Sequence, residues 1–154
     1  MHPVSLVTLG KLRLAPLRDL EKHYLDMLKP FVRLEVTELT EGKGTPAKAL
    51  KEEADRLRPR LKAARCAVLL DPAGPARTSE AFAAWLCERV DRGESFCFAL
   101  GSSHGFDPAL KADFPNRLSL SPMTFPHELA RVMLAEQLYR AFTILAGHPY
   151  HGGH

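Results

Sequence analysis

The side chains best suited to chemistry in this 154-residue chain gather in residues 116–151. This stretch contains a short apolar segment, a loop rich in Ser, Pro and Thr at 121–125, and a long helix expected to start at Pro126-His127. It ends in the sequence His-Pro-Tyr-His at residues 148–151, which a helix does not need for its own stability. Its most prominent functional side chains are Arg131, Glu136, Arg140, His148, Tyr150 and His151.

The helix predicted from residue 126 is apolar on two sides. At 100° per residue, one face holds Leu134, Leu138, Ala141, Phe142 and Leu145. The nearly opposite face holds Leu129, Val132 and Met133, in line with Glu136 and Arg140. Such a helix must be covered twice, by its own sheet and by a second surface. In so small a protein, the second surface suggests another copy of the chain.

Two features of this helix concern its charges. Glu136 and Arg140 are spaced i,i+4, where a simple surface pair would contribute only a few tenths of a kcal/mol. Arg131 falls toward the sheet-facing side, where an unpaired cation is unusual, so we expect it to have a designated partner.

Three histidines near the end of the chain, His148, His151 and His154, are spaced by three residues. No acidic residue or cysteine lies beside them, so we expect no metal site. For His148 and His151 the sequence leaves two roles open, a structural turn and direct catalysis.

The cysteines are odd in number, widely spaced and set among apolar residues, at Cys66, Cys87 and Cys97. This pattern favours reduced thiols that fill the core over a disulfide, a metal site or a catalytic nucleophile.

Composition indicates one globular domain over residues 1–154, with 45% hydrophobic and 25% charged residues. No apolar run approaches the roughly 20 residues needed to cross a bilayer, and no secretory signal opens the chain, so we expect a soluble cytoplasmic protein. The net charge of +3 is uneven, since residues 1–65 hold 14 Lys and Arg against 9 Asp and Glu. Such a basic half is compatible with RNA binding and does not require it.

The remaining pattern predicts how the C-terminal third is supported. Strands are expected at 4–9, 32–39, 67–70, 96–100 and 118–120, and helices at 16–28, 46–62, 78–92, after Asp107-Pro108 and from 126. Pro59 should kink or end the second helix near Leu57. Alternating strands and helices, with continuously apolar central strands, predict an α/β fold with a largely parallel sheet. Ligands bind such sheets at the carboxyl ends of the strands, here the loops after Leu70, Leu100 and Leu120.

Two of these loops carry candidate polar groups. Residues 101–105, Gly-Ser-Ser-His-Gly, form neither a GxGxxG nor a Walker loop, and they are either a tight turn or a place where backbone N–H groups approach a ligand. The two serines are not in a G-x-S-x-G elbow, so serine hydrolase chemistry is poorly supported. Asp71 could act as a general base, but an aspartate that stabilises its own turn is the commoner case.

The run LSLSPMTFPHELARVMLAEQLYRA, followed by HPYH, resembles the ribosomal RNA large subunit methyltransferase H family. These are SPOUT-class enzymes that methylate N3 of a pseudouridine in 23S rRNA. The similarity extends over the whole chain, through VTLGK, EGKG, LLDPAG and ALGSSHG, and is most specific in the last third. It implies a C-terminal trefoil knot, which periodicity cannot predict because knots are rare exceptions to normal topology.

The resemblance also implies partners and site residues. Beside the expected absence of a metal and of a membrane, it implies a homodimer that acts on 23S rRNA in the assembled ribosome. S-adenosylmethionine would be held by Leu70, Gly101, Gly105, Leu120, Ser121, Pro122, Met123, Thr124 and Phe125. The matching active-site positions are His127, Arg131, Glu136, Tyr139, Arg140, His148, Tyr150 and His151.

The chain departs from the family at one point. The family usually has Gly-Gly-Pro-Glu-Gly where this chain has Gly101-Ser-Ser-His-Gly105. Either His104 replaces the acidic residue or catalytic output is lower. The competing interpretation is therefore a non-catalytic or weakly active module that binds RNA or the ribosome on the same fold.

Overall fold

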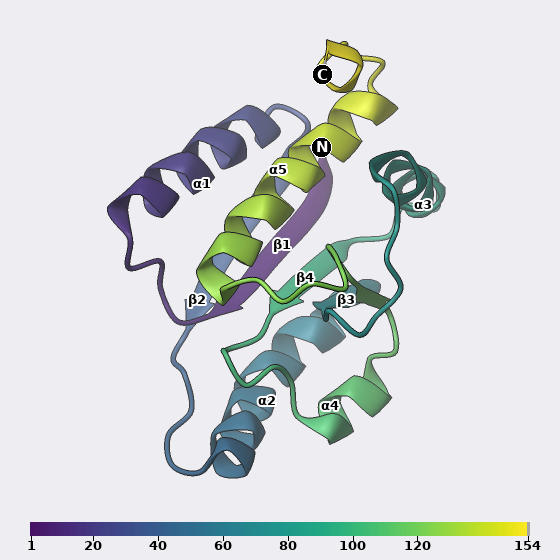
Figure 1. Cartoon of the computed structure of the whole chain (residues 1–154). Helices are drawn as coiled ribbons and strands as arrows, with labels where there is room; N and C mark the ends of the chain where they lie inside the picture. Colours follow the sequence, from purple (N-terminus) through teal and green to yellow (C-terminus); the bar gives the residue numbers. More distant parts are fainter. Residues whose placement is uncertain (154) are drawn as a thin grey trace.

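The computed structural model describes residues 1–153, in which five parallel strands form one sheet (Figure 1). The strands are β1 His2–Leu9, β2 Val32–Leu39, β3 Cys66–Leu70, β4 Phe96–Leu100 and β5 Arg117–Leu118. Their order across the sheet is β2-β1-β4-β3-β5, and every described pairing is parallel. The predicted α/β class with a parallel sheet is confirmed.

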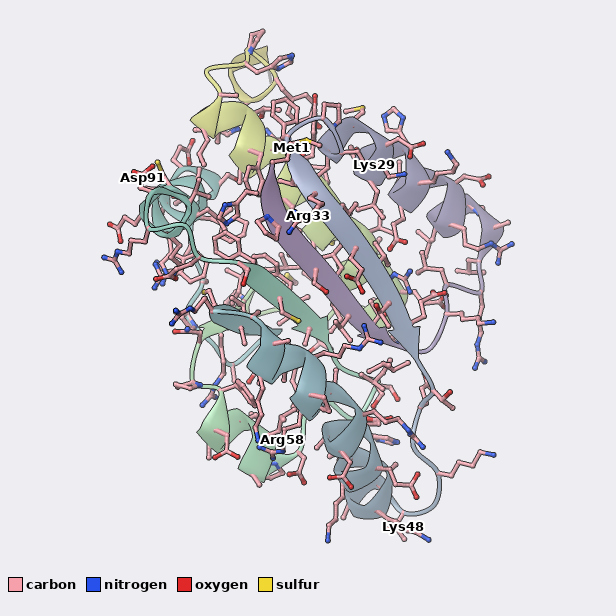
Figure 2. All side chains as sticks on the ribbon, turned by 180° about the vertical axis from the view of Figure 1, so that it is seen from behind. Met1, Lys29, Arg33, Lys48, Arg58 and Asp91 are labelled. Carbon is pink, nitrogen blue, oxygen red and sulfur yellow. The ribbon has the colours of Figure 1, made fainter. Side chains whose placement is uncertain are left out.

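Helices cover both faces of this sheet. They are α1 Ala15–Leu28, α2 Pro46–Ala63, α3 Ser79–Asp91, α4 Pro108–Asp113 and α5 His127–Leu145, followed by a short 3-10 turn, His151–Gly153. One core lies between the sheet and α1, α3 and α5, and a second lies between the sheet and α2 and α4. Seen from behind in Figure 2, α2 crosses the opposite face from α5.

The strand pattern explains these two cores. In β1, Val4 and Leu6 pack into the first core, whereas Val7 and Leu9 pack into the second. All five residues of β4 are buried, as expected for a central strand covered on both faces. Apolar burial on this scale stabilises the fold by about 1.5–3 kcal/mol for each fully buried large side chain.

Capping residues and a glycine set where the helices start and end. The Thr78 side chain accepts a hydrogen bond from the Ala81 N–H at the start of α3, and Thr45 does the same for Lys48 at the start of α2. Gly93 follows α3 with a φ of +71°, a conformation that favours glycine.

Pro59 was expected to kink or end the second helix, and an end near Leu57 is wrong, because α2 continues through Pro59 to Ala63. Proline in a helix interior costs about 3 kcal/mol. Leu57 and Leu61, on either side of it, are almost completely buried in the second core, and their packing offsets that cost.

The last strand is also shorter than predicted. It ends at Leu118, and Ser119 forms an isolated parallel bridge with Ala76. The Ser119 hydroxyl lies within hydrogen-bond distance of the Pro72 and Ser121 carbonyls, at 3.1 and 2.9 Å.

Among the described residues, no helix is long and apolar enough to span a membrane.

Candidate active site

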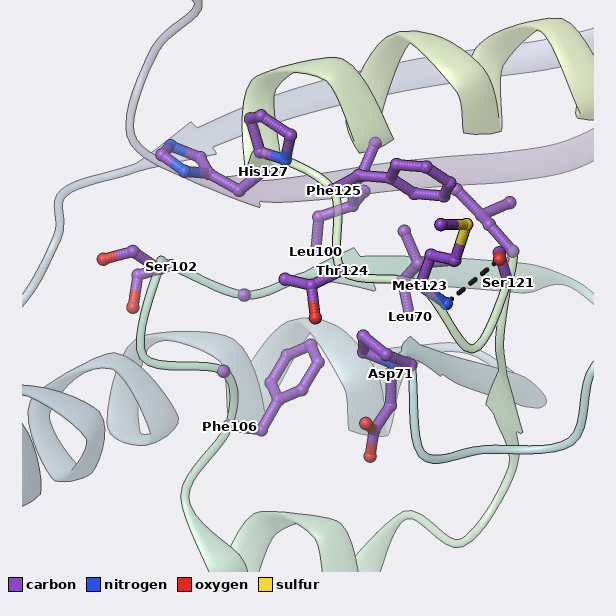
Figure 3. A pocket seen from close by; sticks show the side chains of 17 residues that line it. Leu70, Asp71, Leu100, Ser102, Phe106, Ser121, Met123, Thr124, Phe125 and His127 are labelled. Atoms are coloured by element: carbon purple, nitrogen blue, oxygen red, sulfur yellow. Dashed lines mark hydrogen bonds between the residues drawn. The ribbon is translucent and has the colours of Figure 1, made fainter.

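A cavity of about 510 Å³ lies where β3 and β4 end, closed on one side by the loop that leads into α5 (Figure 3). This is the carboxyl edge of the sheet, where parallel α/β folds bind ligands. The structure brings together eight residues predicted to bind a cofactor, Leu70, Gly101, Gly105, Leu120, Ser121, Met123, Thr124 and Phe125. Pro122 belongs to the same loop but does not line the cavity.

The Gly101 to Gly105 loop is both a tight turn and a wall of the cavity, so the two interpretations left open by the sequence coexist. The Gly105 N–H donates to the Ser102 carbonyl at 3.0 Å. A Cβ at position 101 would lie 2.5 Å from the Gly105 carbonyl oxygen, and Gly105 has a φ of +80°. Glycine at 101 therefore lets the backbone fold back closely enough to shape the cavity.

Within this loop the two serines line the cavity, whereas the side chain of His104 is exposed and does not. Ser102 is buried, and its hydroxyl donates to Glu53 on α2 at 2.7 Å. The position of His104 argues against a direct contact with a ligand in the cavity.

Further lining residues were not assigned to a cofactor by the sequence: Asp71, Pro72, Leu100, Ser102, Ser103, Phe106, Pro126, His127 and Ala130. Of these residues, Leu100 could have been found from the sequence, because it ends a buried strand at the edge where such sheets bind ligands. Asp71 stabilises its own turn, with Oδ1 accepting from the Ala73 N–H at 3.0 Å. Its Oδ2 lies within ion-pair distance of Lys111 and Arg117, at 3.3 and 3.6 Å, although neither contact has hydrogen-bond geometry.

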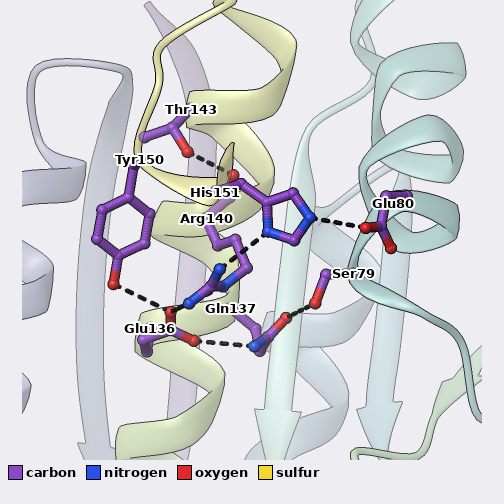
Figure 4. A network of polar contacts seen from close by, with 8 residues as sticks. All are labelled: Ser79, Glu80, Glu136, Gln137, Arg140, Thr143, Tyr150 and His151. Carbon is purple, nitrogen blue, oxygen red and sulfur yellow. Dashed lines mark hydrogen bonds and ion pairs between the residues drawn. The ribbon is translucent and has the colours of Figure 1, made fainter. Parts of the chain in front are cut away.

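A second polar cluster lies at the other end of α5 (Figure 4). Glu136 Oε1 accepts from Arg140 Nε and NH2 at 2.9 and 2.6 Å, and from the Tyr150 hydroxyl at 3.1 Å. Arg140 NH1 contacts His151 Nδ1 at 2.9 Å, and His151 Nε2 contacts Glu80 of α3 at 2.7 Å. The Glu136–Arg140 pair is thus part of a network that holds the tail against the helix.

The contacts of His151 define its protonation form. Arginine can only donate, so Nδ1 must accept from Arg140, and Nε2 must then carry the proton donated to Glu80. This is the neutral tautomer. The hydrogen bond from His151 lowers the pKa of Glu80, which keeps that carboxylate ionised as the acceptor.

Tyr150 is held as a donor. Burial and the neighbouring Glu136 carboxylate raise the pKa of Tyr150 to about 12. The phenol therefore stays protonated at neutral pH and orients by donating to Glu136.

His148 is exposed and has a structural contact in the tail. Its Nδ1 accepts from the Tyr150 N–H at 3.2 Å, and its ring lies edge-on to Phe31 with centroids 6.5 Å apart. His154 lies outside the described residues.

Arg131 has the designated partners that its position indicated. It is 8% exposed, and it forms a bidentate pair with Glu21 of α1, at 2.5 and 2.9 Å. Its NH1 also donates to Glu38 of β2 and Thr8 of β1, at 2.7 and 3.1 Å. Burial lowers the pKa of Arg131, but the hydrogen bonds to Glu21 and Glu38 outweigh burial, so the net effect is a raised pKa. Arg131 thus ties α5 to three other elements.

The cavity and the tail cluster are far apart within one chain. Arg140 comes 13 residues after His127, and at 1.5 Å per residue this separates them by about 20 Å along α5. The predicted catalytic residues are therefore not gathered around the cavity by a single copy.

The cysteines do not contribute to either place. Cys66 and Cys97 are buried and free, and burial raises the pKa of both thiols, that of Cys97 to about 11. Cys87 is also free but only half-buried, so it fills the core less completely than expected. No three potential metal ligands come together within residues 1–153.

A parallel α/β fold with a ligand cavity at the carboxyl edge of its sheet defines a broad class of enzymes, and comparison with known sequences narrows it. A family model described as "Predicted SPOUT methyltransferase" matches residues 2–151, and the chain belongs to this family. The family resemblance read from the last third is thereby confirmed.

Individual relatives are similar over nearly their whole length. A protein of Gemmatimonas aurantiaca is 41% identical over 151 residues, covering 96% of this chain and 98% of the relative. One of Rhizobium meliloti is 44% identical over 156 residues with the same coverage, and one of Gluconacetobacter diazotrophicus is 41% identical over 148 residues. All three are named ribosomal RNA large subunit methyltransferase H.

Proposed function

We propose that this chain is an S-adenosylmethionine-dependent enzyme that methylates N3 of a pseudouridine in 23S rRNA of the assembled ribosome. The observation that carries the proposal is the cavity, in which the loops after β3, β4 and β5 converge in a member of a methyltransferase family. The names of the full-length relatives support ribosomal RNA as the substrate. The chain would act in the cytoplasm as a single domain.

The cavity fits the cofactor in size and lining. Its volume lies in the range of about 300–1,000 Å³ typical of small-molecule sites. Leu70, Leu100 and Phe125 supply apolar walls suited to an adenine ring. Gly101 lets the Gly105 backbone pack closely against it to shape the cavity wall, where a Cβ at 101 would clash with the Gly105 carbonyl. S-adenosylmethionine supplies a methyl group on a sulfonium sulfur, which transfers by direct displacement without a metal.

The segment after β5 supports the proposed trefoil knot. Ser119 pairs with Ala76, its N–H donates to the Pro75 carbonyl at 3.0 Å, and its hydroxyl donates to Pro72. The loop that lines the cavity is thus hydrogen-bonded to the β3–α3 connection, and we propose that the chain passes through that connection.

The surface of α1 and α5 supports the proposed homodimer. Leu14, Leu20 and Leu129 are 58%, 41% and 36% exposed, an apolar set that a partner would cover. Part of the second face of α5 is already buried by its own chain, since Val132 is only 2% exposed. The expected need for a second copy therefore applies to the α1–α5 surface.

Pairing through this surface would bring the tail cluster of one copy to the cavity of the other. In an antiparallel pair, the tail of one copy lies near the start of α5 in the other. We propose that Tyr150 and His151 of one copy close the cavity of its partner around the flipped base. A two-fold pair would contain two such composite sites.

Each side chain then has a stated task. Removal of the N3 proton requires a base or a polarised water. Tyr150, fixed by Glu136, orients or stacks on the base. His151 can accept the proton at Nδ1 once Arg140 leaves that nitrogen for RNA phosphate or the base. His148 shapes the tail, and Arg131 positions α5.

Titration calorimetry with S-adenosylmethionine, followed by methylation of whole ribosomes, free subunits and free rRNA, tests the proposal. We expect one cofactor site per chain and methyl transfer to whole ribosomes in preference to the other substrates. A chain that binds ribosomes but not the cofactor would be the non-catalytic module instead.

A further inference from the structure

A charged groove lies between α1 and β2, on the other side of a small hollow from the cavity. A small hollow shares Leu100, Gly101 and His127 with the cavity. The same hollow shares Lys11, Leu12 and Arg131 with a groove of about 640 Å³. The hollow holds only about 10 Å³, so the cavity and the groove are separate spaces that adjoin at the turn following β1.

The groove carries more cations than carboxylates. Its cations are Lys11, Arg18, Lys22, Lys29 and Arg131, and its carboxylates are Glu21, Asp26 and Glu38. All three carboxylates are engaged. Glu21 and Glu38 bind Arg131, and Asp26 binds the two lysines on either side of it, at 2.5 and 2.9 Å.

Two cations of the groove, Lys11 and Arg18, have no acidic partner among residues 1–153. The side chain of Lys11 is exposed and makes no hydrogen bond or ion pair with a described residue. Arg18 has no carboxylate within 4 Å among residues 1–153, and its NH1 donates to the Leu12 and Arg13 carbonyls at 3.1 and 2.9 Å. Glu128 at the junction accepts from the Arg13 backbone N–H. The positive charge of Lys11 and Arg18 is therefore available to an anion.

We propose that this groove, here named the α1–β2 groove, holds the RNA strand that continues from the nucleotide in the cavity. The proposal rests on the proposed function, which places the target nucleotide in that cavity. Lys11 and Arg18 bind successive phosphates, because sequence-independent contacts from Lys and Arg dominate RNA affinity. Leu34 and Val36 of β2 form an apolar floor for sugar and base faces.

The groove is distinct from the apolar surface assigned to the second copy. On α1, Leu17, Leu20 and Tyr24 fall roughly 150° around the helix from Arg18, Lys22 and Lys29, at 100° per residue. Interface cores are depleted in charged residues, so the charged groove is a poor dimer contact. It stays open when the α1–α5 surface is covered.

The test measures the KM for whole ribosomes as a function of salt for three proteins. They are the wild type, the variant Lys11→Gln/Arg18→Gln, and a control, Lys48→Gln/Lys51→Gln, which removes two exposed lysines from α2 on the other face of the sheet. The slope of log affinity against log salt should fall by about 1.4 in the groove variant, from about 0.7 per phosphate contact on a single strand. The control should keep the wild-type slope, and all three should bind S-adenosylmethionine equally.

The outcomes separate the groove from the proposed function. An active wild type with equal slopes in the groove variant and the wild type would overturn the groove alone, as would an equal loss in the control. A wild type that transfers no methyl group would overturn the proposed function itself. The single variant Lys11→Gln keeps the turn that Arg18 supports, and its slope of log affinity against log salt should fall by about 0.7.

Discussion

The hydroxyl of Ser102 donates a 2.7 Å hydrogen bond to Glu53 Oε1, joining residues 49 positions apart. The other carboxylate oxygen accepts from the Gly42 N–H at 2.9 Å. Glu53 is only 3% exposed and has no cationic partner among residues 1–153. One buried carboxylate on α2 thus holds both the loop after β2 and the loop that shapes the proposed cofactor cavity.

Removing this carboxylate should weaken both stability and cofactor binding. Glu53→Ala leaves two donors without a buried acceptor and should lower the free energy of unfolding by about 1–3 kcal/mol. Ser102→Ala removes only one contact and should cost less, while raising the Kd for S-adenosylmethionine. Urea denaturation and calorimetry measure the two effects. Asp55→Asn, an exposed change on the same helix, is the control, and an equal response there would contradict the role of Glu53.

The ion cluster around Arg131 should be a major contributor to stability. Arg131→Met leaves Glu21 buried and unpaired, which should cost about 3–5 kcal/mol. Arg131→Met/Glu21→Leu should recover part of that loss, because it also removes the buried charge. Arg92→Met, on an exposed arginine, should change stability by less than about 0.5 kcal/mol. A loss no larger at 131 than at 92, in chemical denaturation, would show that the cluster is not needed.

The raised pKa of Tyr150 makes the free energy of unfolding depend on pH. Its folded pKa is raised from 10.0 to about 12, so the folded state retains the phenol proton over this interval while the unfolded state loses it. The associated stability is fully present below pH 10 and is lost as pH rises toward 12. The difference in unfolding free energy between wild type and Tyr150→Phe should therefore shrink across this window. The tyrosinate absorbance that Tyr150→Phe removes should titrate near pH 12, and titration near pH 10 would contradict the burial of the phenol.

The composite site predicts activity in trans. Gly101→Ala places a Cβ 2.5 Å from a carbonyl oxygen and should abolish cofactor binding, and Tyr150→Phe/His151→Ala should abolish transfer with cofactor affinity intact. Mixed dimers of the two variants contain one intact site, so co-expression should restore up to about a quarter of wild-type activity. A mixture as inactive as either parent would mean that the tail acts within its own copy.

Much of the fold follows from short-range pattern. The apolar runs that became β3 and β4 are buried on both faces, and Thr78 and Gly93 bound α3 as their chemistry indicates. Pro59 is the exception, because the burial of Leu57 and Leu61 overrides a local rule. Tertiary packing of this kind is invisible in a window of a few residues.

The site could be predicted only in part for the same reason. Strand ends in a parallel sheet converge on one edge, so the cavity loops could be named in advance. The partners of Arg131 and the Ser102–Glu53 contact join distant segments, and a sequence pattern contains no information on such pairings. The tail lies far from the cavity because α5 is long. The sequence predicted this helix, but it did not show that the helix would separate the tail from the cavity.

The proposed activity is tested by transfer of a labelled methyl group from S-adenosylmethionine to whole ribosomes, with the product nucleotide mapped. Ribosomes from a strain without the corresponding modification serve as substrate, and Gly101→Ala serves as the inactive control. We expect label at N3 of one pseudouridine in 23S rRNA with the wild type and none with the variant. A folded wild type that binds the cofactor yet labels no 23S nucleotide, or labels a different atom, would show that the proposed activity is wrong.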